Sequence, residues 1–201
     1  MSYIEPSLKP FRIKNVKFVN KTVRCKKLLI PTHTALSGNY NETIINELRT
    51  LFTDFYKNTQ KKQTNDKVYI SRGKAHCRKI INENECIAVL EKFGFKTIFF
   101  EDHSFENQVK IASNAKYLIP NHGAGLTNML FLQPGSNILE LRKKGDSHNN
   151  CYFSLASTLD LNYFYQICDS MNPDENALTA DLIVDCQLLQ RNIDHMLSIS
   201  N

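Results

Sequence analysis

Short apolar runs alternate with helix-length amphipathic segments along most of this chain. Four of the runs are typical of buried strands, and they cover residues 68–71, 97–100, 117–120 and 138–141. Strands that alternate with helices build a mostly parallel sheet with helices on both faces. The pattern therefore predicts the α/β fold class, with a Rossmann-like sheet.

Amphipathic segments and capping residues predict where the helices lie. Apolar residues recur at steps of three and four over 41–57, so a long helix is expected there. Further helices are expected to begin at Asn82, Ser104 and Thr179, because each side chain can accept a hydrogen bond from a first helical turn. A shorter helix is expected over residues 126–132, where a Pro-Gly pair follows it.

These elements divide the chain into three parts. Residues 1–64 would comprise a basic leader and the first amphipathic helix, closed by a polar run at 58–67. Residues 65–178 would form the Rossmann-like domain. Residues 179–201 would add a C-terminal helix with heptad-like apolar steps, which is expected to pack back on the N-terminal part.

The composition is that of one soluble domain with added segments. Hydrophobic residues make up 42% of the 201 and charged residues 22%, which is enough to bury a core. No apolar run approaches the roughly 20 residues of a membrane span, and no targeting signal follows Met1. We therefore expect no membrane span and a cytoplasmic location. The glycosylation sequons at Asn20 and Asn41 favour the alternative, the lumen of the endoplasmic reticulum or Golgi.

The six cysteines show no C-x-x-C pair and no dense framework. Several fall at apolar positions of the expected helices or strands, which is typical of buried free thiols. A reducing compartment fits this pattern.

The net charge of +5 is concentrated near the N-terminus. Residues 6–40 carry eight lysines and arginines and no acid, so this stretch holds +8 and the rest of the chain −3. Such a stripe can bind nucleic acid, but here basic residues alternate with apolar ones, which is more typical of the solvated face of a strand. The apolar residues are Phe11, Ile13, Val16 and Phe18. Nucleic acid is therefore not an expected partner.

A glycine turn follows the third apolar run. A strand, a glycine turn and a helix in succession aim backbone N–H groups and the positive end of a helix dipole at one point, as in phosphate sites. The spacing is only G-x-G, so a tight turn without a ligand is the alternative. An imidazole, a hydroxyl and an amide lie in the turn, and a purely structural turn needs none of them. The candidate phosphate-binding residues are His122, Gly123, Ala124, Gly125, Leu126, Thr127 and Asn128.

Two arginines follow the first expected strand. Arg72 comes directly after it, and Arg78 stands six residues later. Both would lie at the carboxyl edge of the sheet, where open α/β sheets bind ligands. Planar guanidinium groups bind phosphate oxygens through paired hydrogen bonds, so the two suit a diphosphate. Exposed arginines in a solvated loop are the alternative.

Four other polar residues are candidates near this edge. Glu101 and Asp102 end the second expected strand, where a carboxylate can accept hydrogen bonds from ribose hydroxyls or act as a base. A solvated strand end is the alternative for both. Gln108 lies at the start of the next helix and is a candidate for orienting the glycine turn. Glu140 interrupts an apolar strand, which is costly unless its carboxylate has partners.

The sequence contains no recognised metal or nucleophile motif. Its six histidines form no H-x-x-x-H pair, and no D-x-D ends a strand. The G-x-S-x-G elbow of serine hydrolases is also absent. No metal is therefore expected.

Taken together, these pieces resemble glycosyltransferase family 61. The order and spacing agree over about residues 28–199, and most densely from 68 to 141. The residues that carry the resemblance are Tyr69-Ile-Ser-Arg72, Arg78, Asn82-Glu83, Ser104 to Val109 with Gln108, His122-Gly-Ala-Gly-Leu-Thr-Asn128, Pro134-Gly-Ser136 and Glu140.

The resemblance implies a two-domain GT-B type fold whose C-terminal, Rossmann-like half binds a nucleotide sugar, usually a UDP-sugar. Transfer to a glycan or protein hydroxyl would invert the anomeric centre and would need neither metal nor cofactor. Members include protein O-linked N-acetylglucosaminyltransferases, plant xylan xylosyl- and arabinosyltransferases, and bacterial enzymes of capsular polysaccharide synthesis. By motif position, Arg72 and residues 122–128 would hold the diphosphate with support from Arg78, and Gln108 and Glu140 are further candidates for donor binding.

The chain departs from the family pattern in two ways. It resembles the donor half alone, so residues 1–64 are expected to be a remnant of an acceptor-side domain or a linker to one, and a missing domain or partner subunit would complete the enzyme. In the family an arginine commonly follows the Ser-Arg pair, whereas here Gly73 follows Ser71 and Arg72, so a second phosphate contact is not expected from this position. The base stays open among Glu101, Asp102, His122 and a residue outside this chain. Two other functions are alternatives to a glycosyltransferase. The first is a non-catalytic subunit that binds a nucleotide or anion, and the second is a leader that binds nucleic acid.

Overall fold

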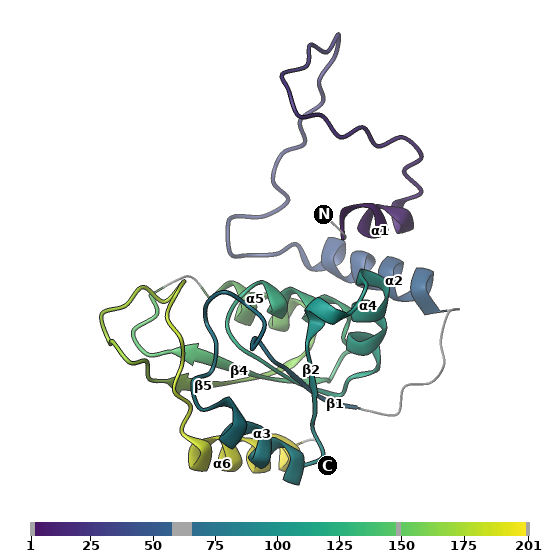
Figure 1. The fold of residues 1–201 in the computed structure, drawn as a ribbon. Coiled ribbons are helices and arrows are strands. Elements are labelled where there is room, and N and C mark those ends of the chain that lie inside the picture. The colour runs from purple at the N-terminus through teal and green to yellow at the C-terminus, as the bar shows by residue number, and fades with distance from the viewer. Residues whose placement is uncertain (1–2, 58–65, 148–149, 200–201) are drawn as a thin grey trace.

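Five parallel strands form one sheet at the centre of the molecule (Figure 1). The structure is a computed structural model, and it describes residues 3–57, 66–147 and 150–199. The strand order is β2-β1-β3-β4-β5. The bounds are Lys67–Ile70 for β1, Lys96–Ile98 for β2, Tyr117–Pro120 for β3, Asn137–Lys143 for β4 and Asn162–Cys168 for β5. This sheet confirms the α/β fold class.

Helices cover both faces of the sheet (Figure 1). α3 and α6 pack on one face, and α4, α5 and the 3-10 helix η3 pack on the other. Successive side chains of a strand point to opposite faces, so Val68 lies in the core beneath α4 and Tyr69 in the core above α3. The bounds are Glu83–Lys92 for α3, Phe105–Asn114 for α4, Ala124–Phe131 for η3, Cys151–Thr158 for α5 and Cys186–Ile199 for α6.

The strand order places a topological switch between β1 and β3. The sheet continues from β1 to β2 on one side, whereas β3, β4 and β5 are added on the other. The chain leaves β1 toward α3 on one face, and it leaves β3 toward η3 on the opposite face. In open α/β sheets such a divergence leaves a crevice outside the carboxyl ends of the two strands, and ligands bind there.

All four expected strands are present, with small differences in their bounds. β2 ends at Ile98, and the 3-10 turn η2 (Phe100–Asp102) follows it. The expectation that Glu101 and Asp102 end a strand is therefore wrong, since both lie in this turn. The pattern analysis missed β5. This strand forms the edge of the sheet, and it exposes Tyr165 and Ile167, so it lacks the continuous apolar run of a buried strand.

The long amphipathic helix is confirmed as α2 (Glu42–Lys57). It packs outside α4 and η3, where the buried Phe52 ring lies 5.9 Å from Phe105 and 5.6 Å from Phe131, measured between centroids. These edge-on and tilted aromatic contacts join α2 to the layer that covers the sheet.

Of the three expected helix caps, Ser104 is confirmed, whereas Asn82 and Thr179 do not cap helices through their side chains. Ser104 does cap α4, because its hydroxyl accepts a hydrogen bond from the Asn107 amide at 3.4 Å. Asn82 precedes α3 but makes no cap hydrogen bond. Its side chain instead donates to the Val184 carbonyl at 2.8 Å and accepts from the Val184 amide at 3.0 Å. A distant strand-like segment therefore competes successfully for the Asn82 amide.

The start and the packing of the C-terminal helix also correct the prediction. α6 begins at Cys186 rather than near Thr179, and Asp185 caps it by accepting hydrogen bonds from the first-turn amides at 2.9 and 3.0 Å. The buried stripe of Leu189, Ile193 and Met196 packs with α3 against β4 and β5. Among the described residues, α6 therefore packs on the face of the sheet opposite to the helical layer that α2 contacts, rather than back on the N-terminal part.

The basic leader contains two short helical turns and a long irregular stretch. α1 (Ile4–Leu8) and the 3-10 helix η1 (Lys9–Phe11) rest near α2, and residues 13–41 form neither helix nor strand. The expected strand with a solvated face is therefore wrong, and this stretch extends away from the sheet (Figure 1). The expected linker at 58–65 lies outside the described residues. In the described ranges, none of the helices has both the length and the apolar character that a membrane crossing requires.

Candidate functional site

Two arginines and the glycine turn meet at the switch between β1 and β3. Arg72 and Arg78 lie on the connection that follows β1, and His122 and Gly123 follow β3. The Arg78 Nη1 donates to the His122 carbonyl at 3.2 Å, and the Asn121 side-chain amide donates to the Arg78 carbonyl at 3.0 Å. The fold thus joins one of the predicted arginines directly to the predicted turn.

Arg78 and Gly123 have backbone conformations that few residues adopt. The φ of Arg78 is 58°, in the left-handed region that is uncommon for a residue other than glycine. Gly123 has φ 141° and ψ −172°, which only glycine adopts readily. A Cβ at Gly123 would lie 2.7 Å from Arg78 Nη1, so a side chain here would require the guanidinium to move. Strained backbone that persists in a fold is concentrated at functional sites.

Three buried polar atoms at this crevice have no hydrogen-bond partner among the described residues. They are Arg72 Nε, Arg78 Nε and Asn121 Oδ1. Buried polar groups in folded proteins are nearly always paired, so two unpaired guanidinium donors side by side indicate an absent acceptor. Burial, and then the nearby Arg78 charge, lowers the pKa of Arg72. An anion between the two guanidiniums would supply the acceptor and relieve their repulsion.

The turn continues into η3, a 3-10 helix of eight residues rather than the expected helix over 126–132. The Thr127 hydroxyl donates to the Ala124 carbonyl at 2.7 Å, and the Asn128 amide donates to the Gly125 carbonyl at 3.1 Å. Leu126 is buried in the core. The side chains of these predicted site residues therefore hold the turn itself, and the groups that the turn offers to a ligand are backbone N–H groups.

His122 lies at the centre of a second network on the same edge. Its Nδ1 contacts Glu140 Oε1, and the Tyr163 hydroxyl donates to Glu140 Oε2. On the other side of the ring, Nε2 lies 3.8 Å from Asp146 Oδ2, which accepts a hydrogen bond from Arg142 Nε at 2.9 Å. Glu140 is fully buried, so these contacts supply the partners that its carboxylate requires.

A segment just before α6 holds the arginine connection in place. The amide of Lys79 donates to Asp181 Oδ1 at 2.8 Å, 102 positions later in the chain. Leu182 extends the contact, because its amide donates to the Lys79 carbonyl and its carbonyl accepts from the Ile81 amide, both at 2.8 Å. We call residues 181–184 the clamp. The Asn82 side chain is hydrogen-bonded to Val184 at the end of this segment. The clamp fixes the segment that follows Arg78.

Three other predicted residues lie around this edge with partners of their own. The Gln108 amide donates to the carbonyls of Phe100 and His103 at 2.8 and 3.1 Å, so it holds the η2 turn rather than the glycine turn. Asp102 pairs with Lys74 at 2.5 Å, where both side chains are half exposed. Glu101 is exposed, and its charge acts on Arg72.

Sequence reasoning missed four residues of these networks. Tyr163 lies on β5, the strand that was itself missed. Asp146 lies in the turn after β4, where nothing in the sequence distinguishes it from a solvated turn residue. Tyr152, on α5, packs its ring edge-on to the His122 ring with 5.2 Å between centroids. Asn121 had a visible signal, because an amide directly after a fully apolar strand is expected to have a specific partner.

Comparison with known proteins identifies the family of this chain. The family model described as Glycosyltransferase 61 matches residues 3–139, which is more than half of the chain. The chain belongs to glycosyltransferase family 61. Within this family 61 chain, the matched range contains both arginines and the whole glycine turn.

Two curated relatives illustrate how much of a longer protein this family 61 chain resembles. It is 39% identical over 98 residues to the EGF domain-specific O-linked N-acetylglucosamine transferase of Drosophila melanogaster, which covers 47% of this chain and 18% of the relative. It is 36% identical over 107 residues to the human protein O-linked-mannose beta-1,4-N-acetylglucosaminyltransferase 2, with 51% and 18% covered. The chain therefore spans about a fifth of the length of these relatives.

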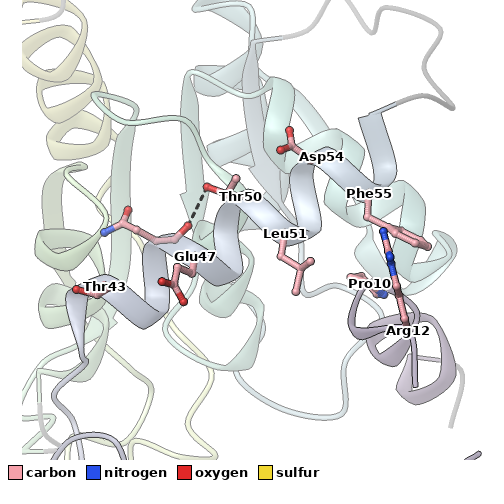
Figure 2. A pocket seen from close by; sticks show the side chains of 9 residues that line it. Pro10, Arg12, Thr43, Glu47, Thr50, Leu51, Asp54 and Phe55 are labelled. Atoms are coloured by element: carbon pink, nitrogen blue, oxygen red, sulfur yellow. Dashed lines mark hydrogen bonds between the residues drawn. The ribbon is translucent and has the colours of Figure 1, made fainter. Parts of the chain in front are cut away.

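Two of the cavities among the described residues of the family 61 structure lie at different places. The larger, of about 810 Å³, runs along the outer side of α2 between Glu47, Asp54 and Phe55 and the leader residues Pro10 and Arg12 (Figure 2). It contains none of the predicted site residues. The smaller, of about 440 Å³, is lined in part by Asp146 and Tyr163 from the His122 network. We therefore associate the smaller cavity with the site.

Among the residues that the family 61 structure describes, no three His, Cys, Asp or Glu side chains lie close enough together to hold a metal ion. Cationic groups at the crevice come instead from arginine. Arg72 and Arg78 are both only partly exposed there.

Proposed function

We propose that this family 61 domain binds the diphosphate of a nucleotide sugar at the β1–β3 switch and takes part in transferring the sugar to a glycan or protein hydroxyl. The observation that carries the proposal is the pair of buried, unpaired guanidinium nitrogens, Arg72 Nε and Arg78 Nε, beside the positive-φ Gly123. A diphosphate has the charge and the several acceptor oxygens that such a pair requires. The backbone N–H groups at the start of η3 add donors to the same point.

The arrangement fits the chemical need of the transfer. When the acceptor hydroxyl attacks the anomeric carbon, the nucleoside diphosphate departs with increased negative charge. Guanidinium groups fixed in a partly dehydrated crevice stabilise that charge without reorganising. We accordingly propose a metal-independent reaction that inverts the anomeric centre and needs no cofactor beyond the donor.

The relatives support a more specific donor. Both are named as transferases of N-acetylglucosamine, one to EGF domains and one to O-linked mannose. We propose UDP-N-acetylglucosamine as the donor, a GT-B type arrangement in the whole enzyme, and an acceptor-side domain or partner subunit outside the described chain. None of the six cysteines forms a disulfide in the described residues, which supports the cytoplasmic location proposed from the sequence; the lumen of the endoplasmic reticulum or Golgi is the alternative.

Calorimetric titration of the chain with UDP, with and without EDTA, tests the proposal. We expect saturable binding that the chelator does not change. Arg78→Ala should weaken it by about 1.5–3 kcal/mol, or roughly 10- to 150-fold, the scale of a lost hydrogen bond to a charged group. Lys74→Ala is the matched control, because this nearby cation is half exposed and paired with Asp102. A folded chain that does not bind UDP would contradict the proposal, and binding without transfer would favour the non-catalytic subunit.

A further inference from the structure

We propose that His122 is the general base of the transfer and that Glu140 and Tyr163 are positioning residues that hold its ring. The inference rests on the proposed function, because it assigns a role within the same site. Three elements contribute, since Tyr163 lies on β5, Glu140 on β4 and His122 directly beyond β3. Glu140 alternates with Leu139 and so lies on the face of the sheet that α5 covers, where Tyr163 packs and where the Glu140 carboxylate contacts both other residues.

Both carboxylate oxygens of Glu140 contact protein groups, so we do not assign this residue to donor binding. It is fully buried, one oxygen contacts His122 Nδ1, and the other accepts from the Tyr163 hydroxyl. A buried carboxylate is costly unless both of its oxygens are paired, and here both are paired with protein groups. Glu140 therefore acts through His122, not on the diphosphate.

The His122 ring contacts Glu140 through Nδ1, packs edge-on against Tyr152, and lies near Asp146 on the Nε2 side. The other nitrogen, Nε2, is 3.8 Å from Asp146 Oδ2, which is beyond hydrogen-bond range. Asp146 already accepts from Arg142, and it lines the cavity of about 440 Å³. Asp146 therefore connects His122 Nε2 to this cavity, and the hydrogen bond from Arg78 Nη1 to the His122 carbonyl connects the same residue to the arginines.

This geometry is that of a histidine base with an orienting carboxylate. When Nδ1–H donates to Glu140, Nε2 carries the lone pair and accepts the proton. In the transfer, the acceptor oxygen forms its bond to the anomeric carbon and gives its proton to Nε2. The bond from that carbon to the phosphate oxygen breaks, and the nucleoside diphosphate leaves with the electron pair. Glu140 stabilises the imidazolium that results.

Among the described residues, the titratable groups that face His122 come from several elements. Glu140 and Arg142 belong to β4, Asp146 to the turn after it, Tyr152 to α5, and Arg78 reaches the His122 carbonyl from the other side of the crevice. Burial is the largest cause that raises the pKa of Tyr152 to about 12. Tyr152 therefore stays neutral while His122 exchanges its proton.

The ring tautomer tests the assignment without requiring turnover. Long-range ¹H–¹⁵N spectra of the labelled chain distinguish Nδ1–H from Nε2–H, and the His122→Gln variant assigns the signals among six histidines. We expect neutral His122 to carry its proton on Nδ1 in the wild-type chain and to lose this preference in Glu140→Gln. A wild-type chain with the proton on Nε2 would overturn the assignment.

Kinetics with UDP-N-acetylglucosamine separate positioning from donor binding. Glu140→Gln should lower the turnover number about 100-fold or more, the scale of a lost general base, while the Kd for UDP changes less than about 2-fold. Tyr163→Phe should cause a smaller fall in turnover and shift its pH profile. Tyr3→Phe is the control, because this tyrosine precedes α1, lies outside both described cavities and is 59% exposed, and it should match wild type.

The possible failures are distinct. If Glu140→Gln weakens UDP binding as strongly as Arg78→Ala does, Glu140 is a donor ligand and the positioning role is wrong. If UDP binds normally but turnover and its pH profile are unchanged in Glu140→Gln and Tyr163→Phe, His122 is not the base. If the wild-type chain does not bind UDP at all, the proposed function itself fails.

Discussion

Replacing Gly123 by alanine adds one methyl group where the Arg78 guanidinium lies. Its carbon would be 2.7 Å from Nη1 and 3.0 Å from Cζ, and alanine would have to adopt φ 141°. Such a backbone costs a residue other than glycine about 1–3 kcal/mol. At about 2–4 °C per kcal/mol for a chain of this length, the melting temperature should fall by roughly 2–12 °C. Differential scanning calorimetry measures this fall.

The same substitution should weaken UDP binding, because the Arg78 side chain has to move away from the turn. Gly125→Ala is the matched control for the melting temperature: its φ is not positive, and a Cβ there meets nothing within 4 Å. Alanine inside a helical turn should change stability by about 1 kcal/mol or less, in the stabilising direction. If Gly123→Ala melts and binds UDP as wild type does, the argument that Arg78 requires this glycine is refuted.

Three further predictions concern the scaffold. Ser104→Ala should lower the free energy of unfolding by about 1 kcal/mol through loss of the α4 cap, whereas Thr179→Ala, at a position that caps no helix, should not; urea unfolding compares them. Burial raises the pKa of Cys168 from 9.0 to about 12. As the pH rises, the Cys168 thiol loses its proton in the unfolded chain before it does so in the folded chain. The free energy of unfolding should therefore be unaffected below pH 9 and fall by up to about 1.4 kcal/mol per pH unit toward pH 12. Cys168→Ala should show a gentler fall. Asp181→Ala removes the acceptor of the Lys79 amide. Amide hydrogen exchange at Lys79 should become faster, and the affinity for UDP should weaken. Unchanged exchange and affinity would show that the clamp does not support the site.

The inner strands were predictable because both of their faces are buried. β3 is buried at every position and appears in the sequence as a continuous apolar run, and β4 is buried at all but one position and is marked by Ile138, Leu139 and Leu141 around the buried Glu140. The edge strand β5 has water on part of one face, so its exposed and buried positions mix. The cap at Asn82 was also beyond local reasoning, since its competing partner Val184 is distant in sequence.

The site was predictable where local backbone chemistry determines it. A glycine after an apolar strand and an arginine after a neighbouring one place both groups at the same sheet edge, whatever the remaining topology. The pairing of His122 with Glu140 was not predictable, because it depends on register. Asn121 pairs with Leu141 across the two strands, and a shift of one residue would turn Glu140 to the opposite face.

The clamp connects the proposed donor site to α6. Since residues 181–184 bond the segment that follows Arg78 and lead directly into α6, we expect docking of this helix and order at the two arginines to be coupled. Linkage is reciprocal, so a ligand that favours the ordered arginine connection also favours the docked helix by the same factor. Anything that loosens α6 from α3 and the sheet would weaken donor affinity from a surface that the donor never touches.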